Sequence, residues 1–217
     1  MCRQEHIPHF LLSTLVLAAI LAACRPGPPE PAYIPRTAAV KLLRESAEAF
    51  AAGDTAKARV KINAALEEDP GYYLVHSFHS LLLGHEGETA AAEEAMQKAL
   101  AIEPDFGKGH LISGVFQERL GNEEAARAAY ARAIEIFDAE YEEGTYDPEH
   151  QCYRAVAIYL TEGRVLGQAA IDQVLLAHRE HPLAAAVREN MRSEARPYFL
   201  EWAATARTTP AAAPANE

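Results

Sequence analysis

The stretches GDTAKARVKINAALEEDP (53–70), GETAAAEEAMQKALAIEP (87–104) and GNEEAARAAYARAIEIFD (121–138) decide the fold, because they recur at equal intervals along the chain. Each starts with a glycine and carries two alanines at matching offsets. The matching positions are Gly53, Gly87 and Gly121, then Ala58, Ala92 and Ala126, and last Ala65, Ala99 and Ala133. Self-similarity at a fixed period of roughly 20 to 50 residues is typical of stacked supersecondary units. We therefore expect a repeat architecture.

The period and the small residues resemble those of the tetratricopeptide repeat, a helix-turn-helix unit of about 34 residues. The resemblance implies an all-α fold, a right-handed superhelical stack of such units. It places three units at 39–72, 73–106 and 107–140. In each unit the glycine is expected to end the first helix in the left-handed backbone conformation. The alanines then let the two helices approach closely.

Larger residues complete the same pattern. Ile62, Met96 and Tyr130 fall at one position of the repeat and are expected to fill the slot between the paired helices. Pro70 and Pro104 should stop the second helix of the first two units, because proline lacks the backbone donor that a helix needs. Asp138 stands where the third proline is expected, so the helix should run on there.

A weaker unit follows the third repeat. Residues 141–150 (YEEGTYDPEH) form an insertion, and residues 151–184 resemble a degenerate fourth unit, in which Ala170, Ala177 and Pro182 fall on the family positions. Its turn glycine is displaced, since Gly163 precedes the expected site and Val165 occupies it. We expect two helices here as well.

A terminal helix should cover the last apolar face, as stacked repeats require. Apolar residues at near-helical spacing place this capping helix at 185–206, with Pro197 breaking or kinking it. Residues 207–217 (RTTPAAAPANE) carry too little apolar bulk to fold, which predicts a disordered tail.

The amino terminus has a different composition. A sparse positive charge at Arg3 precedes an apolar run from Phe10 to Ala23, which is typical of a secretory signal peptide at 1–23. The run ends in LAAC (21–24), which resembles the lipobox of bacterial lipoproteins. The resemblance implies cleavage before Cys24, acyl chains such as palmitate on its sulfur and amine, and anchoring at the periplasmic face of the outer membrane, because Arg25 rather than Asp follows. An ordinary signal peptide and an uncleaved anchor helix with an incidental cysteine are the alternatives.

Five prolines follow the cysteine between residues 25 and 37, so residues 24–38 should form an extended tether. The net charge of −11 opposes binding to nucleic acid and electrostatic adhesion to anionic lipid, because both need a basic surface. Attachment to a membrane would therefore depend on the lipid anchor.

The first helices of the repeats line a concave groove in the resembled family. The corresponding positions of this chain are mostly apolar: Val40, Leu43, Leu74, Phe78, Leu81, Leu111, Ile112 and Val115. Lys108 is one of the few charged exceptions. Family members that clamp a peptide carboxylate use several Lys, Arg and Asn side chains there, and this set is absent. The groove should instead bind a helix or an apolar segment of another envelope protein.

Two other functions stay open. The groove can be filled by the chain itself or by a second copy, which would make the protein a structural homodimer. Alternatively, His76, His79 and His110 can approach one another and bind a metal ion in the periplasm. We favour packing roles for these histidines and expect no metal site and no cofactor.

Catalysis has no positive signal. Cys152 would be the one cysteine left after Cys2 is removed and Cys24 acylated, and we interpret it as a small buried residue. His150 lies two residues away, but closeness in sequence does not make it a base for a thiol nucleophile. No phosphate-binding loop or serine-elbow motif is present. The sequence therefore predicts an interaction scaffold, not an enzyme.

Overall fold

A computed structural model describes residues 33–144 and 147–192. The chain divides into two units, residues 1–34 and residues 35–217, and the description below concerns the second. The predicted signal peptide, Cys24 and the tail at 207–217 lie outside the described residues, as does most of the tether. No helix within the described ranges has both the length and the apolar character needed to cross a bilayer.

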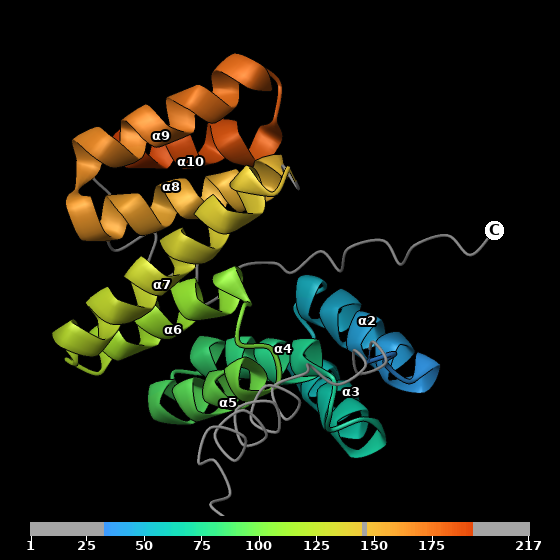
Figure 1. The fold of residues 1–217 in the computed structure, drawn as a ribbon. Coiled ribbons are helices and arrows are strands. Elements are labelled where there is room, and N and C mark those ends of the chain that lie inside the picture. Colours follow the sequence, from blue (N-terminus) through green and yellow to red (C-terminus); the bar gives the residue numbers. More distant parts are fainter. Residues whose placement is uncertain (1–32, 145–146, 193–217) are drawn as a thin grey trace, which may run out of the picture. The chain divides into compact units, whose positions relative to one another are not determined.

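The described part of the chain is all-α and forms helix pairs that follow one another in sequence and in space (Figure 1). The helices are α2 (Thr37–Ala51), α3 (Thr55–Glu68), α4 (Tyr73–His85), α5 (Thr89–Ile102), α6 (Gly107–Arg119), α7 (Glu123–Glu142), α8 (Pro148–Glu162), α9 (Arg164–Ala177) and α10 (Pro182–Arg192). Packing is closest within the pairs α2–α3, α4–α5, α6–α7 and α8–α9, and each pair also contacts the next. The predicted all-α repeat stack is therefore confirmed.

The turns within the first three pairs share one geometry. Gly53, Gly87 and Gly121 have φ values of 81°, 84° and 80°, which residues with a Cβ rarely adopt. At each turn the glycine N–H bonds to the carbonyl three residues back, and the next N–H bonds to a carbonyl five residues back. This is the Schellman motif, which satisfies carbonyls that the helix end leaves unpaired. The constant interval between these glycines therefore marks repeated helix ends.

The paired helices meet on the small residues. The six repeat alanines are at most 2% exposed, and Ile62, Met96 and Tyr130 are at most 1% exposed, so the predicted packing is confirmed. Two clusters of buried residues meet at α6. Leu111 and Val115 belong to the cluster that runs toward α10, whereas Ile112 and Phe116 belong to the cluster that runs toward α2. Helix α6 is thus buried on both sides.

The later helices depart from the regular repeat. Helix α7 continues through Asp138 to Glu142, as the missing proline predicts, and α8 begins at Pro148. Both ends of the predicted insertion at 141–150 are therefore helical. The α8–α9 turn consists of Gly163 alone, with φ 94°, and α9 begins at once at Arg164. A turn this short explains why the glycine is displaced from the family position.

The first residues of α2 and α10 differ from the predicted boundaries. Helix α2 begins at Thr37, inside the segment predicted as tether, and α10 begins at Pro182, inside the predicted fourth unit. Proline is favoured in the first turn of a helix because its missing donor has no partner there anyway. The capping helix predicted at 185–206 is described only as far as Arg192, where α10 packs against α8 and α9. The rest of that segment is outside the described residues.

Candidate functional site

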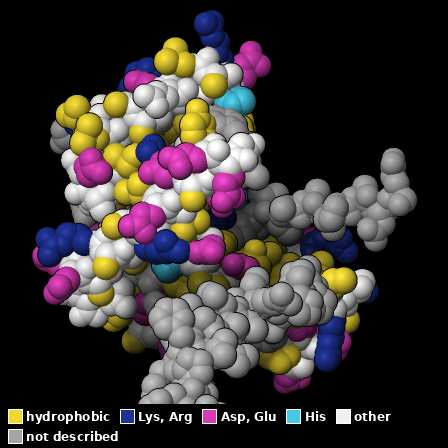
Figure 2. All heavy atoms as spheres, in the orientation of Figure 1, with side chains coloured by type: hydrophobic (Ala, Val, Ile, Leu, Met, Phe, Trp, Pro, Cys, Tyr) yellow, Lys and Arg dark blue, Asp and Glu magenta, His cyan; other side chains and the backbone are white. Residues whose placement is uncertain are grey.

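A pocket with a volume of about 320 Å³ opens on the face formed by the first helices of the pairs. Most of its lining residues come from α2, α4, α6 and α8, and others come from the loop before α6 and from the end of α7. Figure 2 shows apolar side chains in the recess beside α2, next to acidic ones. The apolar lining residues are Leu43, Ala47, Tyr73, Leu74, Phe78, Phe106, Phe137 and Tyr153.

The pocket exists because α4 and α6 stand apart. Direct contacts join α2 to α4 and α6 to α8, whereas α4 and α6 have almost none. Phe106, just before α6, lies between them, with its ring centroid 5.0 Å from that of Tyr73. Gly109 makes room for Phe106, since a Cβ on Gly109 would lie 2.4 Å from a ring carbon of Phe106. The aromatic wedge and the small residue together open the first-helix face.

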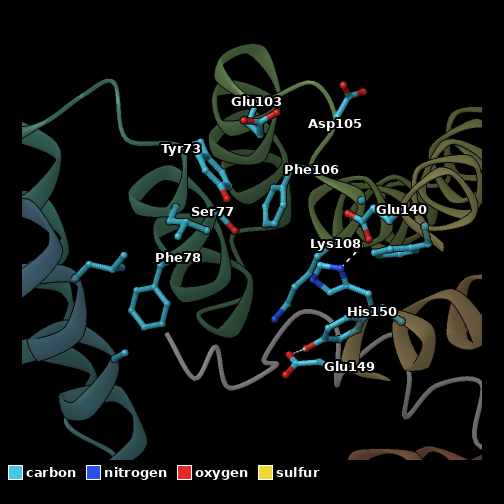
Figure 3. A pocket seen from close by; sticks show the side chains of 16 residues that line it. Tyr73, Ser77, Phe78, Glu103, Asp105, Phe106, Lys108, Glu140, Glu149 and His150 are labelled. Atoms are coloured by element: carbon cyan, nitrogen blue, oxygen red, sulfur yellow. Dashed lines mark hydrogen bonds and ion pairs between the residues drawn. The ribbon is translucent and has the colours of Figure 1, made fainter. Parts of the chain in front are cut away.

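Lys108 extends from α6 into the space between Phe78 of α4 and Glu149 of α8 (Figure 3). Its Nζ lies 4.6 Å from the centroid of the Tyr153 ring, a cation–π contact. It forms no ion pair with any residue in the ranges that the structure describes. Burial lowers the pKa of Lys108, and the charge of Glu149 partly opposes this shift. The pocket therefore holds a half-buried lysine whose charged form is disfavoured by its surroundings.

Four carboxylates line the pocket, and none of them forms an ion pair with Lys108. Glu149 Oε1 accepts a hydrogen bond of 2.8 Å from the Tyr153 hydroxyl. Glu140 Oε2 lies 2.7 Å from His150 Nδ1, which ties the extended end of α7 to α8. Glu103 and Asp105 lie on the opposite rim, near the start of α6. The site thus combines apolar walls, one central ammonium and an acidic rim.

The structure separates the predicted groove residues into two groups. Leu43, Leu74 and Phe78 line the pocket. Val40 is half-buried on α2 and does not line it. Leu81, Leu111, Ile112 and Val115 are at most 1% exposed and belong to the core clusters. Their assignment to the groove is corrected: these side chains fill the space between neighbouring helix pairs, so no partner reaches them in this conformation.

Several pocket residues were missed by the sequence reasoning. Tyr73 and Phe106 lie at the junctions between units, while Phe137 and Glu140 come from the second helix of a pair. The one available signal was Asp138, since a helix that runs past it carries Glu140 to the first-helix face. Lys108 was visible as a charged exception on an apolar face, and the structure puts it at the centre.

The side chains of His76, His110 and Cys152 take part in hydrogen bonding or packing within the fold. His76 Nε2 lies 2.8 Å from the Pro70 carbonyl and His110 Nε2 lies 2.9 Å from the Pro104 carbonyl. A carbonyl only accepts, so each ring nitrogen donates there. The described residues contain no group of three or more His, Cys, Asp or Glu side chains placed to hold a metal ion. Cys152 is fully buried, as predicted, and burial raises the pKa of its thiol to about 12, which suppresses the nucleophilic thiolate.

Comparison with known proteins agrees with the repeat fold. A tetratricopeptide repeat model matches residues 110–139, within α6 and α7. The structure of pilF of Pseudomonas aeruginosa is similar, with a TM-score of 0.54 and 20% identity, covering 77% of this chain and 73% of that one. PilW, a type IV pilus biogenesis factor, has a TM-score of 0.54 and 18% identity, covering 78% of each chain.

One curated relative matches part of the chain. It is the tetratricopeptide repeat and J domain-containing co-chaperone DNJ1 of Fusarium oxysporum f. sp. lycopersici, 29% identical over 126 residues. The match covers 58% of this chain and 24% of that relative, so the chain corresponds to about a quarter of DNJ1. The match of the repeat model to residues 110–139 agrees with the constant repeat period of the sequence, and the similar solved structures agree with the all-α fold.

Proposed function

We propose that this protein is a non-catalytic adaptor, tethered to the outer membrane of a bacterium, that binds an apolar segment of another envelope protein in the pocket. Proteins with stacked repeats of this kind have extended surfaces suited to such binding. The repeat family supports protein–protein interaction in general, and the envelope location and the pocket as the binding site are our own assignments.

The observation that carries the proposal is the apolar pocket on the first-helix face. Its walls include the half-buried Tyr73, Leu74 and Phe106, which lie at the start and the end of the unit 73–106. A concave apolar surface with a few polar groups is the usual form of a binding site. An apolar helix face or an extended apolar segment would cover these side chains, and the acidic rim would favour a partner with basic flanking residues.

The envelope location is supported by the sequence of residues 1–24. An apolar run that ends in LAAC is what acylation of Cys24 would require. Two or more acyl chains would hold the protein firmly at a bilayer, whereas one chain binds only marginally. DNJ1 is named a co-chaperone and PilW a pilus biogenesis factor. The adaptor role proposed here is, like theirs, an assisting role, but we assign neither co-chaperone activity nor pilus biogenesis to this chain.

The test is site-specific photocrosslinking in the native cell. A photoreactive phenylalanine analogue replaces Leu74 in the pocket or, as the control, Val60, which is 67% exposed on α3 away from the pocket. We expect a crosslinked envelope protein from position 74 and not from position 60. Ala47→Arg should abolish that product by filling the pocket, whereas Ala90→Arg, on the exposed surface of α5, should not. Identical products from positions 74 and 60 would contradict the proposal.

A further inference from the structure

We infer that the pocket is occupied, when no partner is bound, by the chain's own segment Tyr198–Trp202, with Glu201 paired to Lys108. This inference concerns the same pocket as the proposed function. Docking of the chain's own segment does not require a partner protein, so an experiment can contradict this inference without contradicting the proposed function.

The pocket sets two chemical requirements for an occupant. Its apolar lining needs large apolar side chains, and Lys108 needs an anion, since it meets the face of Tyr153 but no carboxylate among the described residues. Lys108 is half-buried among apolar side chains, so a carboxylate that enters with an apolar segment gains more from pairing with it here than at the exposed surface. A volume of about 320 Å³ suits a few side chains.

The segment after α10 meets both requirements. The sequence Tyr198, Phe199, Leu200, Glu201, Trp202 places four large apolar residues around a single carboxylate. The preceding Arg196 complements the acidic rim of the pocket, where Glu140 and Glu149 lie. Left in water, such a cluster would be an aggregation hazard, so it needs a place to pack.

The geometry permits the contact. Helix α10 ends at Arg192 and packs against α8, the helix that supplies Glu149, His150 and Tyr153 to the pocket. Helix α8 has 15 residues and is therefore about 22 Å long. Nine residues lead from Arg192 to Glu201, enough to span about 30 Å when extended. The extended linker is therefore longer than α8, whose first turns line the pocket.

A competing surface lies on α9. Val165 and Leu176 are 78% and 75% exposed and lie about three turns apart on one side of this helix. They offer apolar contact, but they do not line the recess around Lys108. We therefore favour the pocket, and packing on α9 becomes a distinct outcome of the test.

Trp202 makes the test direct, because it is the single tryptophan of the 217 residues. In the purified full chain we expect blue-shifted tryptophan emission that is shielded from acrylamide quenching. Lys108→Gln should lower the ratio of docked to free segment about tenfold, seen as a red shift and stronger quenching. The control Lys98→Gln changes an exposed lysine that pairs with Glu94, and it should leave the emission unchanged. Circular dichroism shows that each variant remains folded.

Charge reversal separates the specific pair from a general loss of packing. Glu201→Lys alone should release Trp202, and the combination with Lys108→Glu should restore the shielded emission. The inference is overturned if Trp202 is as accessible in the native chain as in urea, or if its emission ignores both Lys108 variants. It is also overturned if Leu176→Ser on α9 releases Trp202 while Lys108→Gln does not. Crosslinking from position 74 tests the partner independently.

Discussion

Glu93 is an unusual residue in this stack, since it is a carboxylate that is only 6% exposed between α5 and α6. Its Oε1 accepts hydrogen bonds from Gln97, Ser113 and Gln117, at 2.7, 2.8 and 2.8 Å. Its Oε2 is buried and has no hydrogen-bond partner among the described residues. Buried polar groups are costly when unpaired, so this network holds α5 and α6 in one relative position.

Replacement of Glu93 tests that role. Glu93→Leu leaves three donors without their acceptor and should lower the free energy of unfolding by about 3 kcal/mol. Glu93→Gln keeps one acceptor oxygen and should cost clearly less. The neighbouring Glu94, whose side chain is 74% exposed, is the control, and Glu94→Leu should change stability by under about 0.5 kcal/mol. Urea unfolding followed by circular dichroism gives these values, and equal effects at both positions would refute the role of the network.

At the scale of the helices, the side-chain sizes at two facing positions of the repeat vary together. The bulky slot is Ile62, Met96 and Tyr130 in successive units, and the facing position is Ser46, Ser80 and Gly114. A Cβ on Gly114 would lie 2.4 Å from a ring carbon of Tyr130, so the larger ring requires the smaller partner. The pair is a single packing unit, although its two residues are 16 positions apart.

Transplanting the pair of the second unit into the third tests this coupling. Gly114→Ser alone should destabilise by about 1–3 kcal/mol through overpacking, and Tyr130→Met alone should destabilise through lost packing. Together they copy Ser80 and Met96, so the double variant should be at least about 1 kcal/mol more stable than the sum of the single effects predicts. Gly114→Ser combined with Ile62→Met, in the first unit, should be additive. Thermal or urea unfolding measures all variants, and additivity in both pairs would contradict the coupling.

The same scale shows what the sequence could predict. A glycine followed by buried alanines, repeated at a constant interval, indicates helix pairs, because helix ends and close helix packing depend on local residues. The run-on of α7 also followed from Asp138. The pocket did not follow, because it depends on how far α4 stands from α6, and a wedge such as Phe106 acts between units. Their positions in the repeat therefore predicted that Leu111 and Val115 line the groove. In the structure both are buried, because α6 is packed on both sides.

At the scale of the whole molecule, the proposed membrane location depends on the amino-terminal segment of the sequence. The net charge of −11 repels anionic lipid, and no helix in the described ranges is suited to cross a bilayer. The acidic surface and the predicted tether would instead keep the repeats in solution beside the membrane. The proposed location depends on the acylation of Cys24, which is a prediction from LAAC.

Cys24→Ser tests this dependence, because serine has no thiol to accept a thioether-linked lipid. We expect the wild-type chain in the outer-membrane fraction, with a mass increased by acyl chains, and the variant either soluble in the periplasm or retained as an uncleaved precursor. Cys152→Ser is the matched control, since Cys152 is buried in α8 and should not affect fractionation if the variant folds. A Cys24→Ser chain that keeps the wild-type mass and stays in the outer membrane would show that something other than this cysteine holds the protein. The adaptor would then need a different anchor, whereas the pocket and its crosslinking test would be unaffected.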